Sequence, residues 1–385
     1  MKAVLGLDIG TSRVKAVIIG EDGSRFSEGS SQPIPLVRPR PGWAEQDPAE
    51  LGLAVREAIA ASKAPQFDLA AVAVAGQSGS VVIIGEDEQA AGPFITWMDE
   101  RAAGIVNEWE QSEVAARVRA LSGWPAAAHA ALSTLVWVAR NEPEVFRKAS
   151  RFAGPVDFVT HRLTGRWFTN PSNGAGLQLL DVESGKWSDE LCEMASLDPK
   201  QLSELRPSGE VAGEVTTSAS QATGLPVGLP VVNGGHDQTA TAYALNVVDP
   251  GTVLIGCGTA WVITGVAPRP SAPVHLSVSY HLVPGRYCVS VALGELNEIE
   301  EAEAGIRSAL KESALTGGGS PSVVATGGWL ESVGAARRLA TLVGTTLQVP
   351  RGEAWPAVGA AKLAGCSVEL FGPERIVIDW EEFAP

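Results

Sequence analysis

The chain has 385 residues, 45% hydrophobic and 19% charged, which is enough for two domains and too apolar for a mainly disordered protein. Its formal net charge is −15, and no cluster of lysine and arginine offers the positive surface that nucleic acid or an anionic membrane would need. The four cysteines lie far apart without a C-x-x-C pair, and no apolar run reaches the roughly 18 residues of a membrane span. We therefore expect a reduced, cytoplasmic protein that binds neither nucleic acid nor membrane.

The N-terminal part of the chain alternates strands with a helix. Apolar runs at 3–9 and 14–19 flank Gly10-Thr11-Ser12, and this spacing predicts a β-hairpin. Asp47 followed by Pro48 is typical of a capped helix start and predicts a helix that runs to about Ser62. Further strands are predicted at 69–75 and 81–84. Strands that alternate with helices indicate the α/β class.

The middle of the chain is predicted to be mostly helical. Helices are expected from Ala102 to about Ser150 and again at 189–195. Between them, the stretch from Arg166 to Gln178 is expected to be extended and loop-like.

A proline- and glycine-rich approach at 224–232 leads into Gly234-Gly235-His236-Asp237. A helix of small residues is predicted directly afterwards, at 238–245. We place the domain boundary here, which divides the chain into residues 1–233 and 234–385.

Three glycine-containing sites are candidates for phosphate binding. An apolar strand ends in a Gly-Thr tip at Gly10-Thr11-Ser12 and again at Gly258-Thr259. A third strand, at 323–325, leads through Thr326-Gly327-Gly328 to a helix from about Glu331. Glycine lets backbone N–H groups approach anionic oxygens, and hydroxyls and a helix N-terminus add donors. Each site alone is more often an ordinary turn, but three of them, spread over both halves, favour a nucleotide held between the halves.

Two carboxylates accompany these sites. Asp8 ends a hydrophobic strand directly before the first Gly-Thr tip, where a charge requires a cation or hydrogen-bond donors. It is either a ligand of Mg²⁺ on a bound phosphate or a carboxylate that caps its own turn. Asp237 follows two glycines at a helix start, so it is either an ordinary helix cap or a base for a hydroxyl that attacks phosphorus.

In sequence order, several segments resemble motifs of the FGGY carbohydrate kinases, especially the xylulokinase-like branch, and the resemblance covers nearly the whole chain. The segment 7–12 (LDIGTS) is similar to the opening phosphate motif of the family, and 234–238 (GGHDQ) to the motif that carries its catalytic base. The remaining matches are 42–48 (W-x-E-Q-D-P), 76–77 and 97–101 (sugar site), 162–165 (R-L-T-G), 258–259 (second phosphate hairpin) and 326–328 (adenosine motif).

This resemblance implies two actin-like, ribonuclease H-like domains with a cleft between them, the first binding mainly sugar and the second mainly ATP. By the same resemblance, Asp237 would deprotonate a sugar hydroxyl and Asp8 would hold Mg²⁺ on the phosphates. The sugar pocket would be lined by Gln77, Trp97, Asp99 and Arg101 together with Asp237. ATP would contact Gly10, Thr11, Ser12, Gly258, Thr259, Gly327 and Gly328.

The chain departs from the family pattern in four places. It is shorter than the usual member, with the missing part between Leu296-Asn297 and Gly305-Ile306 in the nucleotide domain. Ala260 stands where a serine is common, Trp329 where a third glycine is usual, and Ser78-Gly79-Ser80 where the xylulokinase-like branch has a histidine after Gly76-Gln77. A pentulose such as xylulose is still the first candidate substrate.

Three functions are open at this point. The first is an ATP-dependent kinase of a small sugar or polyol, which the presence of both Asp8 and Asp237 favours. The shortened second domain favours a kinase-like sugar sensor without turnover. The sugar-site segments disfavour the third, another actin-like ATPase such as a chaperone or filament protein. The helices at 102–150 could in addition support a homodimer, which the sequence does not decide.

Overall fold

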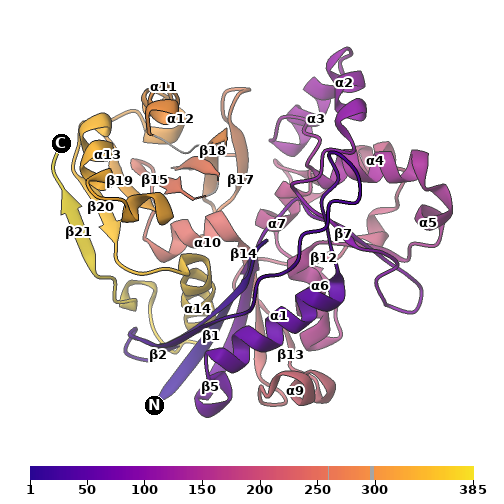
Figure 1. Ribbon diagram of the computed structural model, residues 1–385, viewed down its shortest axis with the longest axis horizontal. Helices are drawn as coiled ribbons and strands as arrows, with labels where there is room; N and C mark the ends of the chain where they lie inside the picture. Colours follow the sequence, from indigo (N-terminus) through magenta and orange to yellow (C-terminus); the bar gives the residue numbers. More distant parts are fainter. Residues whose placement is uncertain (259, 295–298) are drawn as a thin grey trace.

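The computed structural model describes residues 1–258, 260–294 and 299–385, and within them two mixed β-sheets form the frame (Figure 1). The strand order of the first sheet is β13-β14-β5-β1-β2-β3. Its strands are β1 (Lys2–Ile9), β2 (Val14–Gly20), β3 (Arg25–Ser30), β5 (Asp68–Gly76), β13 (Val211–Glu214) and β14 (Pro230–His236). β1, β5 and β14 run parallel, and β1 and β2 form the predicted hairpin, with Ile9 paired to Val14. Because parallel strands end at one edge of a sheet, the segments that follow them gather there.

The second sheet repeats this arrangement in the order β17-β18-β16-β15-β19-β20-β21. Its strands are β15 (Thr252–Cys257), β16 (Trp261–Ala267), β17 (Ser277–Tyr280), β18 (Tyr287–Gly294), β19 (Ser322–Thr326), β20 (Leu347–Pro350) and β21 (Trp380–Phe383). β15 pairs antiparallel with β16 and parallel with β19, as β1 does with β2 and β5. The similarity of the two Gly-Thr segments in the sequence therefore reflects two sheets that are built alike.

Two helices, α10 (Asp237–Ala244) and α14 (Trp355–Ser367), fill the space between the sheets. One buried cluster joins their side chains to Val4 of the first sheet and to Leu254 and Val324 of the second. The backbones lie so close that a Cβ on Gly6 would be 1.9 Å from the Ala357 oxygen, and one on Gly359 would be 2.0 Å from the Ala240 oxygen. Small residues in both helices are therefore what lets this layer form.

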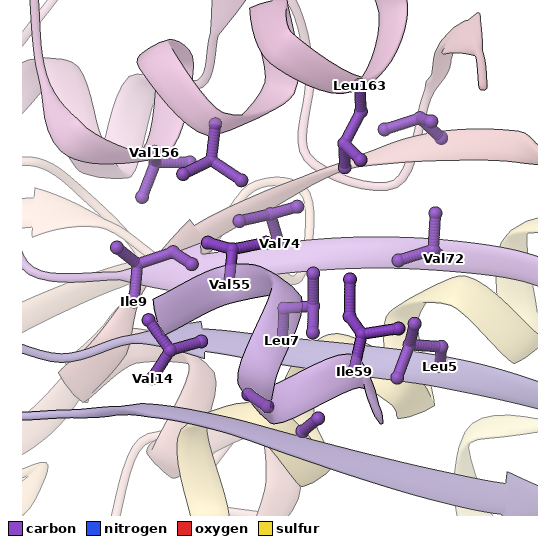
Figure 2. Close-up of a cluster of buried hydrophobic side chains, with 14 of the residues drawn as sticks. Leu5, Leu7, Ile9, Val14, Val55, Ile59, Val72, Val74, Val156 and Leu163 are labelled. Carbon is purple, nitrogen blue, oxygen red and sulfur yellow. The ribbon is translucent and has the colours of Figure 1, made fainter. Parts of the chain in front are cut away.

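The other face of the first sheet is covered by α1 (Pro48–Ala61), α6 (Pro155–Thr164) and α9 (Thr217–Thr223). The predicted start of α1 is confirmed, since the Asp47 side chain caps the helix by accepting a hydrogen bond from the Ala49 N–H. Figure 2 shows the core that results, in which the strand residues Leu7 and Val74 belong to one cluster with Ile59 of α1 and with Val156 and Leu163 of α6. Each such buried aliphatic side chain contributes about 1.5–3 kcal/mol to stability.

A helical subdomain extends from this sheet and has its own core around Phe152, Leu135 and Trp109. The mostly helical prediction for 102–150 is confirmed by four helices: α2 (Ala103–Glu110), α3 (Val114–Ser122), α4 (Ala131–Asn141) and α5 (Pro143–Arg147). The helix predicted at 189–195 is confirmed as α8 (Asp189–Met194). Two-residue or three-residue strands pair around it: β4 (Glu45–Gln46) with β7 (Phe94–Ile95), β6 (Val82–Ile84) with β8 (Arg151–Ala153), β9 (Phe168–Thr169) with β12 (Glu204–Leu205), and β10 (Leu180–Asp181) with β11 (Lys186–Trp187).

The second sheet is covered on its outer side by α11 (Ile299–Ala309), α12 (Ser313–Thr316) and α13 (Ala335–Val343). Short 3₁₀ turns at Ala64–Gln66, Pro199–Gln201, Gly328–Glu331 and Pro373–Arg375 complete the chain. The missing part predicted from Leu296-Asn297 begins outside the described residues.

Two expectations differ from the structure. The stretch from Arg166 to Gln178 is not a plain loop, because α7 (Pro171–Gly176) begins there with Asn170 as its side-chain cap. The helix after Gly327-Gly328 starts at Ala335 rather than at Glu331, because a 3₁₀ turn at Gly328–Glu331 comes first and Gly334, with φ of +77°, directly precedes the helix. The domain boundary predicted between residues 233 and 234 stays a prediction; the two residues lie within β14, which pairs with β5 as far as His236.

Candidate active site

Several predicted site residues gather at the edge where the parallel strands of the first sheet end. Ile9 of β1 and His236 of β14 both pair with Gly76 of β5, so these strand ends lie side by side. The next residues along the chain are the Gly10 tip, Gln77 and Asp237. The structure therefore brings the first phosphate tip, one predicted sugar-site residue and the predicted base together.

Asp8 is buried in β1, one residue before the strand ends at this edge. Its Oδ1 has no hydrogen-bond partner in the part of the chain that the structure describes. Burial raises the pKa of its carboxyl to about 8, and the charge of Asp237 acts in the same direction, whereas Lys15, its partner across the hairpin, lowers it. An unsatisfied buried carboxylate is costly, and its oxygens are the ligands that Mg²⁺ prefers. The residue therefore fits a Mg²⁺ ligand.

Asp8 would have to share such an ion with groups from outside the protein. Among residues 1–258, 260–294 and 299–385 there is no cluster of three or more His, Cys, Asp or Glu side chains placed to hold a metal. Mg²⁺ usually keeps several waters and binds through one or two carboxylates plus substrate phosphates. The donor set thus suits a Mg²⁺ that arrives with a nucleotide rather than a resident structural ion.

Asp237 is the first residue of α10, and its side chain is 31% exposed. Its Oδ1 lies 3.0 Å from His236 Nε2 and accepts a hydrogen bond of 2.6 Å from the Gln238 N–H. Its Oδ2 has no hydrogen bond to any described residue. One oxygen is thus held in place and the other is open to accept a proton, as a general base requires.

The first phosphate tip is narrow because of Gly10, where a Cβ would lie 2.8 Å from the Arg13 carbonyl oxygen. Beyond it, Ser12 is exposed, and its hydroxyl makes no hydrogen bond within the described residues. Ser12 therefore offers a free donor at the point where the sequence predicts phosphate oxygens.

The nucleotide segments of the second sheet also lie together. Gly327 has φ of +127°, and a Cβ there would lie 2.4 Å from the carbonyl group of Cys257, directly before Gly258. This close approach is open only to glycine and joins the end of β19 to the end of β15. Thr259 lies outside the described residues. Trp329, in place of a third glycine, packs edge to face against the buried Trp261 with ring centroids 5.1 Å apart.

The predicted sugar-site residues divide into two groups. Gln77 and Trp97 reach the phosphate tip, where the Trp97 indole N–H donates to the Thr11 hydroxyl at 2.8 Å. Asp99 and Arg101 instead form an internal ion cluster, because the guanidinium donates to both oxygens of Asp99 at 2.8 and 2.9 Å. The structure thus places only Gln77 and Trp97 beside the tip.

The cluster of Glu45, Arg101 and Asp99 is buried and satisfied by protein alone. The Arg101 guanidinium also donates to Glu45 at 2.6 Å and lies 3.7 Å from the centre of the Trp43 ring. Asp99 is 0% exposed and accepts a further hydrogen bond from the Ala44 N–H at 2.6 Å. Both oxygens of Asp99 therefore accept hydrogen bonds within the protein, and its predicted contact with sugar stays a prediction. The cluster instead holds the Trp43 segment against the loop after β7.

Residues that the sequence did not single out complete the site. Lys15 pairs with Glu353 at 3.0 Å, next to Asp8. α7 supports two strand ends at once, since Ser172 Oγ accepts from the His236 N–H at 2.9 Å and the Ser78 hydroxyl donates to the carbonyl of Asn173 at 2.8 Å. The Asn170-Pro171 pair that starts α7 has the same pattern as Asp47-Pro48 and could have revealed the helix.

A cavity of about 1050 Å³ lies between α1, α6 and α9, and its lining includes Gln46, whose amide donates to the Thr11 carbonyl, but none of the predicted site residues. Among the described residues, no helix combines the length and apolar character that a bilayer crossing needs.

Two mixed sheets, each opening with a glycine-tipped hairpin and joined through a pair of helices, define an actin-like, ribonuclease H-like protein of two α/β domains. The solved gluconate kinase from Lactobacillus acidophilus has this fold, with a TM-score of 0.90 over 100% of this chain and 94% of that chain at 20% identity. The chain belongs to the FGGY family of carbohydrate kinases, whose N-terminal domain model matches residues 3–244.

Curated relatives agree with this family. The chain is 30% identical over 293 residues to the xylulose kinase of Escherichia coli (strain K12), which covers 74% of this chain and 58% of that protein. It is also 30% identical over 302 residues to an autoinducer-2 kinase of Klebsiella pneumoniae, covering 74% of this chain and 55% of that protein. The chain thus spans less than two thirds of the length of these relatives.

Proposed function

We propose that the protein is an ATP-dependent kinase that phosphorylates a hydroxyl of a small sugar or polyol, with Asp237 as the general base. The observation that carries this proposal is the position of Asp237, whose open Oδ2 stands at the strand edge beside the phosphate tip. Oδ2 takes the proton of the acceptor hydroxyl while that oxygen attacks the γ-phosphorus, and ADP leaves. The names of the relatives, which are xylulose and autoinducer-2 kinases, support the same reaction class.

We assign the phosphates to the Gly10 tip with the free hydroxyl of Ser12, and the rest of ATP to Gly258, Thr259, Gly327 and Gly328. Mg²⁺, with Asp8 as its carboxylate ligand, would neutralise charge on the phosphate oxygens during transfer. Phosphoryl transfer depends mostly on such positioning and neutralisation.

We assign the sugar to Gln77, Trp97 and Asp237, with a pentulose such as xylulose as the first candidate. A polar amide and an indole face suit a molecule that has hydroxyls on its edge and an apolar ring or chain face. Ser78-Gly79-Ser80 stands where the xylulokinase-like branch has a histidine, and the Ser78 hydroxyl donates to the Asn173 carbonyl of α7. We further propose that residues 1–233 bind mainly sugar and 234–385 mainly ATP, in the cytoplasm.

A substrate panel tests the proposal directly. The protein is incubated with Mg-ATP and, one at a time, ketoses, aldoses and polyols that include xylulose and gluconate, and ADP is followed. ADP that forms only when one of these acceptors is present supports the kinase. If no acceptor in the panel leads to ADP formation and no ATP binding can be measured, a sugar sensor without turnover would be favoured.

A further inference from the structure

Four hydrogen bonds close a ring beside the first phosphate tip. The Trp97 indole N–H donates to the Thr11 hydroxyl at 2.8 Å, and that hydroxyl donates to Gln77 Oε1 at 3.2 Å. The Ser80 hydroxyl donates to the same Gln77 oxygen at 3.0 Å and accepts from the Trp97 backbone N–H at 3.0 Å. Ser80 is 0% exposed and Gln77 is 4% exposed, whereas Thr11 and Trp97 are half-buried, so the bond between Ser80 and Gln77 is the one shielded from competing water.

The ring uses the only hydrogen of the Thr11 hydroxyl. A threonine hydroxyl has one donor and two acceptor sites, and phosphate oxygens can only accept. Because the hydrogen points to Gln77, the hydroxyl cannot also donate to ATP unless the ring breaks. The neighbouring Ser12 hydroxyl has no partner among the described residues, so its hydrogen is free to donate to a phosphate oxygen.

The ring also fixes which end of the Gln77 amide faces away from it. Oε1 accepts from both Thr11 and Ser80, whereas Nε2 makes no hydrogen bond within the described part of the chain. The amide therefore presents two N–H donors, which suit an oxygen of a sugar. The backbone of Thr11 is held as well, since the Gln46 amide donates to its carbonyl at 2.7 Å.

We propose that the Thr11 hydroxyl positions the sugar pocket rather than binding ATP: it orients the Gln77 amide and the Trp97 ring toward the acceptor. The assignment rests on the proposed function, because it deepens the sugar side of that reaction. It further specifies that the acceptor places a hydroxyl or carbonyl oxygen opposite Gln77 Nε2. Binding of that acceptor oxygen, rather than binding of the ATP phosphates, therefore depends on the Thr11 hydroxyl.

Paired variants of adjacent residues test this assignment. Thr11→Val keeps the side-chain shape and removes both hydroxyl bonds, Thr11→Ser restores the hydroxyl, and Ser12→Ala removes the free donor. For each variant, calorimetry measures the Kd of ADP and of the acceptor found in the panel, and steady-state kinetics give the two KM values. Thr11→Val should weaken acceptor binding about five- to thirtyfold and leave the Kd of ADP within about twofold. Thr11→Ser should restore acceptor binding, and Ser12→Ala should show the opposite pattern.

A Thr11→Val protein that loses ADP affinity as Ser12→Ala does, with acceptor binding unchanged, would overturn the assignment. If Thr11→Val does not fold, Trp97→Phe removes the other bond to the same hydroxyl and should weaken acceptor binding alone. Loss of ADP affinity in Trp97→Phe would equally overturn it. A wild-type protein that is silent across the whole panel would instead remove the proposed function, so the two failures are distinguishable.

Discussion

Replacing Arg101 with methionine should destabilise the protein strongly, because the arginine is the cation of a buried cluster. Its side chain is 2% exposed, and the side chains of its partners Asp99 and Glu45 are 0% and 16% exposed. Methionine preserves the aliphatic stem that packs on Trp43 but leaves the Asp99 carboxylate without its cation and two of its hydrogen bonds.

The expected magnitude follows from burial. Removing one partner of a buried ion pair costs roughly 3–5 kcal/mol, since the remaining charge stays desolvated and unpaired. An exposed pair is worth about 0–1 kcal/mol. Arg140 and Glu108 form such a pair at 2.8 Å with side chains 51% and 61% exposed, so Arg140→Met is the matched control.

Urea denaturation followed by far-ultraviolet circular dichroism measures both variants against the wild type. Arg101→Met should lower the unfolding midpoint clearly, and Arg140→Met should leave it nearly unchanged. Adding Asp99→Asn to Arg101→Met should recover part of the loss, because the uncompensated charge is then removed. The reasoning fails if Arg101→Met and Arg140→Met have the same midpoint.

Burial raises the pKa of Asp157 to about 6 from 3.8, so its contribution to stability is fully present below pH 3.8 and is lost as the pH rises through about 6. Urea midpoints of the wild type relative to Asp157→Asn should fall across that window, and a constant difference would contradict the shift. Gly359→Ala should cost roughly 1–3 kcal/mol, because its Cβ meets the Ala240 oxygen, whereas Gly104→Ala, with open space around it, should gain up to about 1 kcal/mol in thermal melts. Equal melting temperatures for the two alanine variants would refute the close packing of α10 on α14. EDTA should abolish acceptor-dependent ADP formation, and Asp8→Asn should raise the Mg²⁺ concentration needed for half-maximal rate; an unchanged Mg²⁺ dependence would rule out Asp8 as a ligand.

Local patterns predicted the elements that frame the site. The Gly-Thr tip between two apolar runs defines the β1–β2 hairpin, and Asp47-Pro48 defines the start of α1, because turn and cap chemistry depend on adjacent residues. The placement of Gln77 and Asp237 at one edge could be anticipated for a similar reason, since each follows a sequence run that is typical of a buried strand.

Contacts between distant residues were not predictable in this way. The pairing of Arg101 with Glu45 joins positions 56 residues apart, and the bond from Trp97 to Thr11 joins positions 86 apart. Sequence patterns assign residue types to a pocket, but only tertiary packing decides which side chain faces ligand and which faces protein. Nothing in the local sequence around Asp99, for example, indicates that both of its oxygens accept hydrogen bonds from within the protein.

The most direct test of the central claim is the turnover of Asp237→Asn with the acceptor identified in the panel. The asparagine keeps the size of the side chain and removes its ability to accept the hydroxyl proton. The rate should fall by about 10²–10⁴-fold, the usual share of a general base, while the Kd values of acceptor and ADP stay close to those of the wild type. A variant that turns over at nearly the wild-type rate would contradict the role of Asp237 and with it the proposed mechanism.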